Sequence, residues 1–133
     1  AAPFIKGSRV DNPETIATAI RIGNPQSWDQ ALKLSKESNG WFDAFSDKEI
    51  LATQKMLTEK EGVFCEPASA TSVAGALRDI KLGKIPEGSS VVCTLTGHGL
   101  KDPDTAIAQC DQNAMINVNP TLEEVKKAIL DHM

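Results

Sequence analysis

The chain has 133 residues, of which 41% are hydrophobic and 24% charged, with a formal net charge of −4 at pH 7. These proportions are those of an ordinary globular protein, and the length suits one domain. The acidic balance argues against nucleic-acid and membrane partners, because binding either one needs clustered lysine and arginine. No apolar run reaches the roughly 18 residues of a membrane span. Three cysteines indicate no disulfide framework, which favours a reducing, cytoplasmic compartment.

The first 45 residues are predicted to form two helices and a strand. The first helix covers residues 13–22, because Asn12 is a good cap and Pro13 suits a first turn. The second begins at Ser27 and ends near Asn39-Gly40, where a left-handed residue can stop a helix. The short aromatic segment 41–45 is predicted to be a strand.

The middle of the chain carries the clearest helix signals. Residues 46–49 read Ser-Asp-Lys-Glu, a capping box, and the helix behind it should run to Gly62. Pro67 begins another helix that Gly83 ends. This helix is expected to turn one face inward, formed by Ala70, Val73, Leu77 and Ile80.

The last third is predicted to alternate short strands and helices. A strand covers residues 90–96, and Asp102-Pro103 starts a short helix. Residues 115–118 form a second brief strand. Thr121 and Glu124 box the final helix, whose core-facing stripe consists of Leu122, Val125 and Ile129.

The strand at 90–96 indicates the fold class. Its residues VVCTL are apolar on both faces, as in an interior strand of a parallel sheet with helices on both sides. The chain offers few neighbours for such a strand, namely the segments 3–6, 41–45 and 115–118. We therefore expect an α/β protein with helices packed on a short, mostly parallel sheet, and we expect residues 1–133 to be one C-terminal portion of a larger protein. The alternative is a small, complete α/β domain.

The turn after this strand, Thr96-Gly97-His98-Gly99, allows three chemistries. The glycines could expose backbone amides to an anion, although Asp102 would repel a phosphate. His98 could bind a metal ion with the three cysteines, although no ligand spacing typical of metal sites is present. Cys93 or Ser69 could act as a nucleophile with His98 as its base. Spacing alone favours none of them. Ligands of doubly wound sheets do bind where strands end, and Thr96 lies at such an end.

Three segments carry a resemblance to a known family. They are DNPETIATAIRIGNPQSW at 11–28, EGVFCEPASATSVAGAL at 61–77 and VVCTLTGHGLKDPDTAI at 91–107. In this order and separation they resemble the C-terminal third of the threonine synthases. That group belongs to the pyridoxal-phosphate enzymes of the tryptophan synthase β chain type. The resemblance runs from Ala1 to about Ile107, and residues 108–133 carry no motif of the family.

The resemblance implies an activity, a cofactor and an assembly. Threonine synthases convert O-phospho-L-homoserine and water to L-threonine and phosphate, the last step of threonine biosynthesis. They hold pyridoxal 5′-phosphate between two α/β domains, and this chain would supply the end of the larger, cofactor-binding domain of a homodimer. Two other functions stay open: a fragment of a related pyridoxal-phosphate dehydratase, and a non-catalytic interaction module.

The resemblance also assigns roles to individual residues. The Thr96 hydroxyl is expected to meet the pyridine nitrogen of the cofactor, with weaker assignments for Gly97 and Glu66. No catalytic residue and no metal ligand is expected in this chain. The Schiff-base lysine and the loop that binds the cofactor phosphate lie upstream in the family, and Lys101 is no substitute for that lysine. The chain alone should be catalytically silent, bind the cofactor weakly and self-associate.

Two further residues are weaker candidates for binding. Arg21 could bind an anionic group, but an ion pair within the fold is the simpler prediction for a single arginine at a helix end. His98 could touch the substrate, although a solvated turn histidine is the simpler interpretation.

Overall fold

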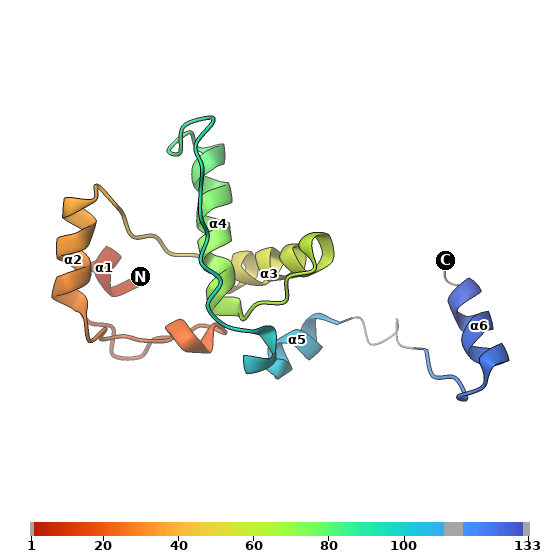
Figure 1. Cartoon of the computed structure of the whole chain (residues 1–133). Helices are drawn as coiled ribbons and strands as arrows, with labels where there is room; N and C mark the ends of the chain where they lie inside the picture. The colour runs from red at the N-terminus through yellow and green to blue at the C-terminus, as the bar shows by residue number, and fades with distance from the viewer. Residues whose placement is uncertain (1, 111–115, 132–133) are drawn as a thin grey trace. The chain divides into compact units, whose positions relative to one another are not determined.

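The computed structural model describes residues 2–110 and 116–131, and the chain divides into two compact units, Ala1–Pro103 and Asp104–Met133. Helices account for the regular structure of both (Figure 1). The first unit contains α1 (Ala2–Lys6), η1 (Thr18–Ile20), α2 (Trp28–Glu37), α3 (Asp47–Glu61), α4 (Pro67–Lys81) and η2 (Gly99–Lys101). Helix α5 (Pro103–Gln109) begins at the boundary, and α6 (Leu122–Leu130) belongs to the second unit.

The two long helices begin and end where their local sequences predict. Ser46 accepts a hydrogen bond from the backbone of Glu49, whose carboxylate accepts one from the backbone of Ser46, so α3 has a complete capping box. Gly62 ends α3 in the left-handed conformation, with φ of 67°. Pro67 occupies the first turn of α4, as predicted. Helix α2 also matches its prediction, and Asn39, with φ of 53°, supplies its left-handed end.

The core of the first unit lies where α3 meets the beginning of α4. One cluster joins Ile50 of α3 to Ala17 and Ala68, and these three residues are all less than a tenth exposed. A second cluster joins Leu57, which is further along α3, to Cys65 and Ala70. The buried Gln54 side chain donates to the carbonyl oxygen of Cys65 over 2.7 Å, which ties α3 to the segment that enters α4. The core is therefore small and concentrated at one end of α4.

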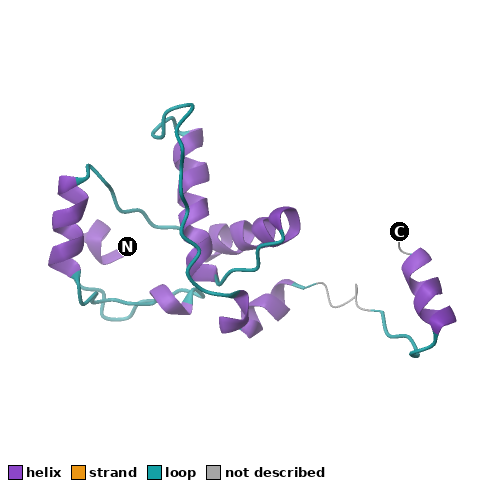
Figure 2. Cartoon of the chain, viewed as in Figure 1, coloured by secondary structure: helices purple, strands orange, loops and turns teal. Residues whose placement is uncertain are grey.

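The predicted strands are not formed. Figure 2 shows helices and loops only, and within residues 2–110 and 116–131 the sole strand-like pairing is an isolated antiparallel bridge between Cys65 and His98. Segments 41–45 and 90–96 have no regular structure, because each lacks a neighbouring strand to accept its backbone hydrogen bonds. Residues 116–118 are also irregular, and the start of that prediction, Met115, lies outside the described residues.

The predicted helix over residues 13–22 is also wrong. Only the short turn η1 forms there. The Asp47 carboxylate accepts a hydrogen bond from the Thr15 hydroxyl over 2.6 Å and another from the backbone of Ile16 over 3.2 Å. The hydroxyl of Thr15 and the backbone N–H of Ile16 thus bond to a distant side chain and not within a helix. The segment also contains β-branched residues, which favour helices only weakly.

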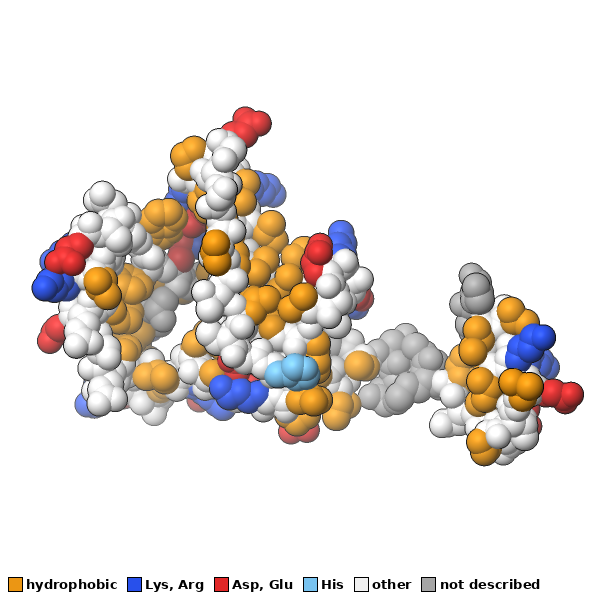
Figure 3. Space-filling view, in the orientation of Figure 1, with side chains coloured by type: hydrophobic (Ala, Val, Ile, Leu, Met, Phe, Trp, Pro, Cys, Tyr) orange, Lys and Arg blue, Asp and Glu red, His pale blue; other side chains and the backbone are white. Residues whose placement is uncertain are grey.

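Two predicted core faces are largely exposed. On α4, Ala70 is fully buried, but Leu77 and Ile80 are 48% and 51% exposed. The stripe on α6 is exposed throughout, at 85% for Leu122, 39% for Val125 and 57% for Ile129. Figure 3 shows hydrophobic side chains on the surface of both units. The periodicity correctly identified helices, while the surfaces that should cover these faces are missing from the described part of the chain.

None of the helices described is both long and apolar enough to cross a bilayer.

Candidate functional site

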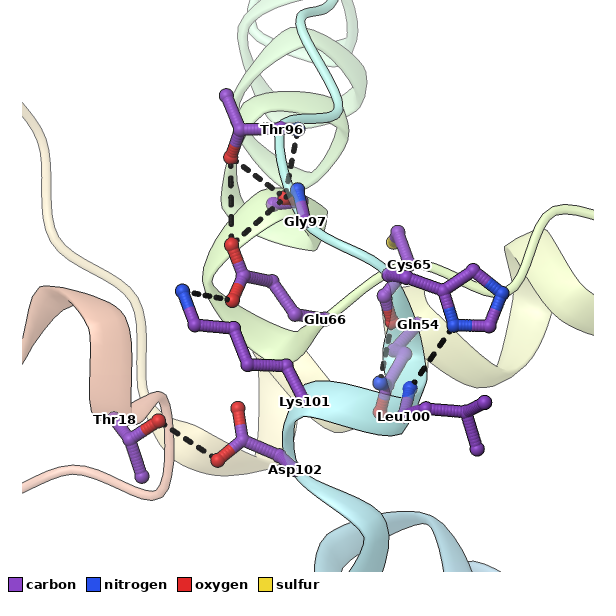
Figure 4. A network of polar contacts seen from close by, with 11 residues as sticks. Thr18, Gln54, Cys65, Glu66, Thr96, Gly97, Leu100, Lys101 and Asp102 are labelled. Carbon is purple, nitrogen blue, oxygen red and sulfur yellow. Dashed lines mark hydrogen bonds and ion pairs between the residues drawn. The ribbon is translucent and has the colours of Figure 1, made fainter.

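Residues 96–101 contact the beginning of α4, and Figure 4 shows the Thr96 side chain above the carboxylate of Glu66. The buried Ser69 side chain connects the two segments. Its Oγ accepts hydrogen bonds from the backbone of Thr96 over 2.9 Å and of Gly97 over 3.1 Å. It also lies 3.0 Å from the Thr96 hydroxyl oxygen. Three polar contacts from one serine therefore fix the position of Thr96, whose side chain remains solvent-exposed.

Glu66 lies directly beneath this turn. It is only 2% exposed, and its Oε1 is 3.4 Å from the Thr96 hydroxyl oxygen. A Cβ atom added at Gly97 would stand 2.2 Å from the Glu66 carboxyl carbon and from Oε1, closer than packed atoms approach. A larger residue at position 97 would therefore force the Glu66 carboxylate to shift.

Lys101 compensates the buried charge of Glu66. Its Nζ lies 3.0 Å from Oε2 of Glu66, and the lysine side chain is itself 56% exposed. A buried carboxylate needs such a partner, because removing it from water is otherwise costly. Glu66 also precedes Pro67 at the start of α4, but its side chain makes no capping bond to that helix. The carboxylate serves the turn at residues 96–101.

The next residue, Asp102, joins the turn to the beginning of the chain. Its Oδ1 accepts a hydrogen bond from the Thr18 hydroxyl over 2.7 Å, and the residue is 8% exposed. Helix α5 begins at Pro103, as predicted, although the carboxylate of Asp102 is directed to Thr18. The motif GLKDP therefore places two consecutive side chains in bonds with two distant segments.

The geometry does not favour the alternatives involving His98. Its Nδ1 accepts a hydrogen bond from the backbone of Leu100 over 3.2 Å, and its ring stands edge-on to that of Phe64. Within the described residues, His, Cys, Asp and Glu side chains form no group of three that could hold a metal ion. Burial raises the pKa of the Cys65 thiol, and the adjacent Glu66 carboxylate raises it further, so this cysteine is a poor nucleophile.

Neither of the predicted nucleophiles bonds to His98. The Cys93 thiol contacts the carbonyl oxygen of Ser72 over 3.7 Å, and the Ser69 hydroxyl is engaged by residues 96 and 97. A serine or cysteine nucleophile requires a base within hydrogen-bond reach. The described contacts therefore give the nucleophilic alternative no support.

Arg21 lies in a different part of the first unit. It lines a pocket of about 640 Å³ together with Trp41, Phe45 and Ile50, and this pocket includes none of the residues around Thr96. Arg21 makes no ion pair in the part of the chain that the structure describes, so the predicted ion pair is absent there.

Comparison with known proteins identifies the family. Residues 1–97 match the family described as pyridoxal-phosphate dependent enzyme. The chain belongs to this family. It is 52% identical over 129 residues to a threonine synthase from Synechocystis sp., covering 97% of this chain and 33% of that protein. A threonine synthase from Halalkalibacterium halodurans is 50% identical over 133 residues, and one from Methanocaldococcus jannaschii is 49% identical over 112 residues.

These alignments cover all of this chain and 36% of the Halalkalibacterium protein, and 78% of this chain and 28% of the Methanocaldococcus protein. The chain thus spans about a third of the length of the curated relatives it matches. Family membership confirms the predicted α/β class and the predicted cofactor, pyridoxal phosphate, at the level of the family. The sheet itself is not formed by the described residues.

The residues around Thr96 fit the ring nitrogen of that cofactor. A pyridine nitrogen in a protein needs one polar partner at the edge of a flat ring. Thr96 offers an exposed hydroxyl whose oxygen is held by Ser69, and the absence of a side chain at Gly97 leaves the turn narrow. The Glu66 carboxylate is directed at Lys101 and the turn, which places a carboxylate behind the hydroxyl.

The three predicted site residues, Thr96, Gly97 and Glu66, do lie together. The sequence-based prediction missed the connecting role of Ser69, which it considered only as a nucleophile, and the ion pair of Lys101. A signal for Ser69 was present in its position three residues after Glu66, because residues three apart on a helix face the same side. No local signal could have paired Lys101 with Glu66, because the two residues are 35 positions apart in the sequence and come together only in the folded chain.

Proposed function

We propose that this chain is the C-terminal third of a threonine synthase, which converts O-phospho-L-homoserine and water to L-threonine and phosphate. The observation that carries the proposal is the similarity to threonine synthases over 97% of the chain at 52% identity. The cluster around Thr96 is compatible with it, because the resemblance predicts that Thr96 contacts the cofactor, and Ser69 holds the Thr96 hydroxyl and backbone in place at the turn.

In the proposed enzyme, Thr96 binds the pyridine nitrogen through its hydroxyl. Pyridoxal phosphate supplies an electron sink when bound. A threonine hydroxyl is not an acid at physiological pH, so it can donate a hydrogen bond only to an unprotonated nitrogen. A carboxylate in that place would instead favour a protonated nitrogen, because opposite charges stabilise each other. The proton thus stays on the Thr96 oxygen, and Gly97 and Glu66 shape the turn behind it.

The proposal extends to the rest of the enzyme. The upstream two thirds would contribute the Schiff-base lysine, the loop that binds the cofactor phosphate and the remaining strands of a short, mostly parallel sheet. Residues 90–96 would then become an interior strand of the larger domain, and the intact protein would be a cytoplasmic homodimer. The chain by itself would be catalytically silent and would bind pyridoxal phosphate weakly.

Phosphate release from O-phospho-L-homoserine by the intact protein, meaning the longer protein proposed above, tests the function. Thr96→Val keeps the side-chain volume and removes the hydroxyl, which should cost roughly 1–3 kcal/mol, or about one to two decades in kcat. Thr96→Ser should retain most of the activity. Thr94→Val is the matched control, because it makes the same change two residues away on the same segment, and Thr94 accepts a hydrogen bond from Ser72 through its backbone carbonyl.

Two results would contradict the proposal. An intact wild-type protein that releases no phosphate from this substrate would exclude the activity. Full turnover with an unchanged visible spectrum in Thr96→Val would leave Thr96 as an ordinary turn residue.

A further inference from the structure

The end of α2 contains a chemically reactive pair of residues. Asn39 is followed by Gly40, and this is the only Asn-Gly pair in the sequence. The backbone nitrogen that follows an asparagine can attack the carbon of the side-chain amide. Glycine hinders this attack least, because it has no side chain and its backbone is the most adaptable. Both residues are exposed, so water and base reach them.

The other asparagines of the sequence are poorer substrates for the same attack. Three of them, Asn12, Asn24 and Asn119, precede a proline, whose nitrogen has no proton to lose. Asn113 precedes alanine and Asn117 precedes valine, so the attacking nitrogen would belong to a residue with a side chain. The sequence therefore directs this chemistry to the Asn-Gly pair.

In the folded chain, the attacking nitrogen is engaged by the last turn of α2. Asn39 is left-handed, with φ of 53°, and the backbone of Gly40 donates a hydrogen bond to the carbonyl oxygen of Ser35 over 2.8 Å. The Ser35 hydroxyl donates in turn to the carbonyl oxygen of Gly40 over 2.7 Å. A nitrogen must lose its proton before it attacks, and a hydrogen-bonded proton is harder to remove. The two bonds therefore protect Asn39 while they persist.

Little packing supports these two bonds. None of the residues 28–37, all of which the structure describes, is buried, and Leu34 near the end of α2 is 63% exposed. A helix end that is held by exposed hydrogen bonds opens at a free energy far below that of global unfolding. The Gly40 nitrogen is thus released repeatedly while the core between α3 and α4 stays folded.

We propose that Asn39 is a site of spontaneous deamidation whose rate is set by opening of the end of α2. When the bonds to Ser35 open, the Gly40 nitrogen loses its proton and bonds to the side-chain carbonyl carbon of Asn39. The bond from this carbon to the amide nitrogen breaks, and that nitrogen leaves with the proton as ammonia. Water then opens the cyclic imide at either carbonyl, which gives aspartate or isoaspartate. Water is the only other reactant.

The reaction cannot be reversed by refolding. Either product places a negative charge at the carboxyl end of α2, where the helix dipole is also negative. Isoaspartate also routes the backbone through the former side chain, so the left-handed residue that ends the helix is lost. Deamidation therefore loosens the helix end that had delayed it. This inference is independent of the proposed enzymatic function, because it uses no residue of the cofactor site.

The experiment is incubation of the chain at neutral pH, with mass spectrometry of its peptides at intervals. Replacement of an amide nitrogen by oxygen should accumulate at Asn39 and not at Asn12 or Asn24, which are internal controls. Conversion should be faster in urea, where α2 is open throughout. Ser35→Ala removes the hydroxyl that donates to Gly40, so conversion in buffer should be roughly two- to tenfold faster, the effect of one hydrogen bond.

Two variants separate the opening of α2 from the chemistry of the pair. Thr53→Ala is the matched control for Ser35→Ala, because it removes the same kind of bond, from a hydroxyl to a backbone carbonyl, in α3. It should leave the rate at Asn39 unchanged. Gly40→Ala should slow conversion in urea, because the added methyl group hinders the attack itself.

Three outcomes would overturn the inference. The first is an unmodified Asn39 in buffer after the urea-unfolded chain has been fully converted. The second is an equal rate in buffer, in urea and in Ser35→Ala. Should Ser35→Ala fail to fold, hydrogen exchange of the Gly40 amide in the wild type decides, because exchange only through global unfolding would rule out local opening of α2.

Discussion

The two halves of α4 differ sharply in what surrounds them. In the first half, Ala68, Ser69 and Ala70 are each less than a tenth exposed, and Ser69 bonds to residues 96 and 97. In the second half, Leu77 and Ile80 are about half exposed. In segment 90–96, which follows α4 and its loop, Val92 is 92% exposed. The first half of α4 is thus packed in a core, whereas the apolar side chains Leu77 and Ile80 of its second half are not covered by the described residues.

This difference indicates which contacts the chain can make alone. The first half of α4 is buried by Ala17, by α3 and by the turn at 96–102, all of which belong to this chain. The second half offers an apolar face to a sheet that the described residues do not form. Burial of that face would require strands from elsewhere, which fits the chain's coverage of about a third of its relatives' length. Three experiments test the comparison.

The largest effect is expected in α3, in the core that covers the first half of α4. Ile50 is 2% exposed in the cluster with Ala17 and Ala68, so Ile50→Ala should leave a cavity and lower the free energy of unfolding by about 2–5 kcal/mol. Leu77→Ala is the matched change in the second half of α4. It should lower the free energy of unfolding by about 1 kcal/mol or less, because Leu77 is 48% exposed. Urea unfolding of the chain measures both. Equal losses would mean that the two halves are equally well packed.

A smaller effect is expected at the turn. In Gly97→Ala the new methyl group would displace the Glu66 carboxylate from beneath the turn, which should cost about 1–3 kcal/mol. Gly75→Ala is the control. Gly75 lies inside α4, and a Cβ atom there would be 3.7 Å from the Phe45 ring, an ordinary contact distance. That change should stabilise the chain by about 0.5–1 kcal/mol. Thermal unfolding that moved in the same direction for both variants would show that Glu66 is not confined as described.

The third effect is a pH dependence in the second half of α4. Burial would raise the pKa of Asp79 above 3.8, but hydrogen bonds from Trp41 and Lys84 outweigh it and lower the pKa. A carboxyl whose pKa is lower in the folded state contributes stability above its unfolded value. That contribution should be present above pH 3.8 and lost as the pH falls through the lowered value.

Asp79→Asn should therefore flatten the acid branch of the stability curve, measured by urea unfolding at successive pH values. Glu87→Gln is the control, because Glu87 lies exposed in the loop after α4. An acid branch of unchanged slope in Asp79→Asn would show that the bonds to Trp41 and Lys84 do not favour the charged carboxylate.

The sequence by itself determined the helices whose ends are chemically marked. Ser46 and Gly62 bound α3, and Pro67 begins α4, because caps and left-handed stops are decided by residues only three or four positions apart. The motif around Thr96 also indicated the family. The cofactor contact that the resemblance assigns to Thr96, Gly97 and Glu66 stays a prediction, although the three residues are neighbours in the structure.

Only the tertiary structure decided the rest. Residues 13–22 follow the bonds to Asp47, and segment 90–96 stays irregular because strands form only in pairs. The connection of Ser69 to Thr96 and of Lys101 to Glu66 likewise depends on segments that meet only after folding. Local sequence determines where a helix starts, because its bonds are local, whereas the contact between the Ser69 and Thr96 hydroxyls joins groups 27 positions apart in the chain.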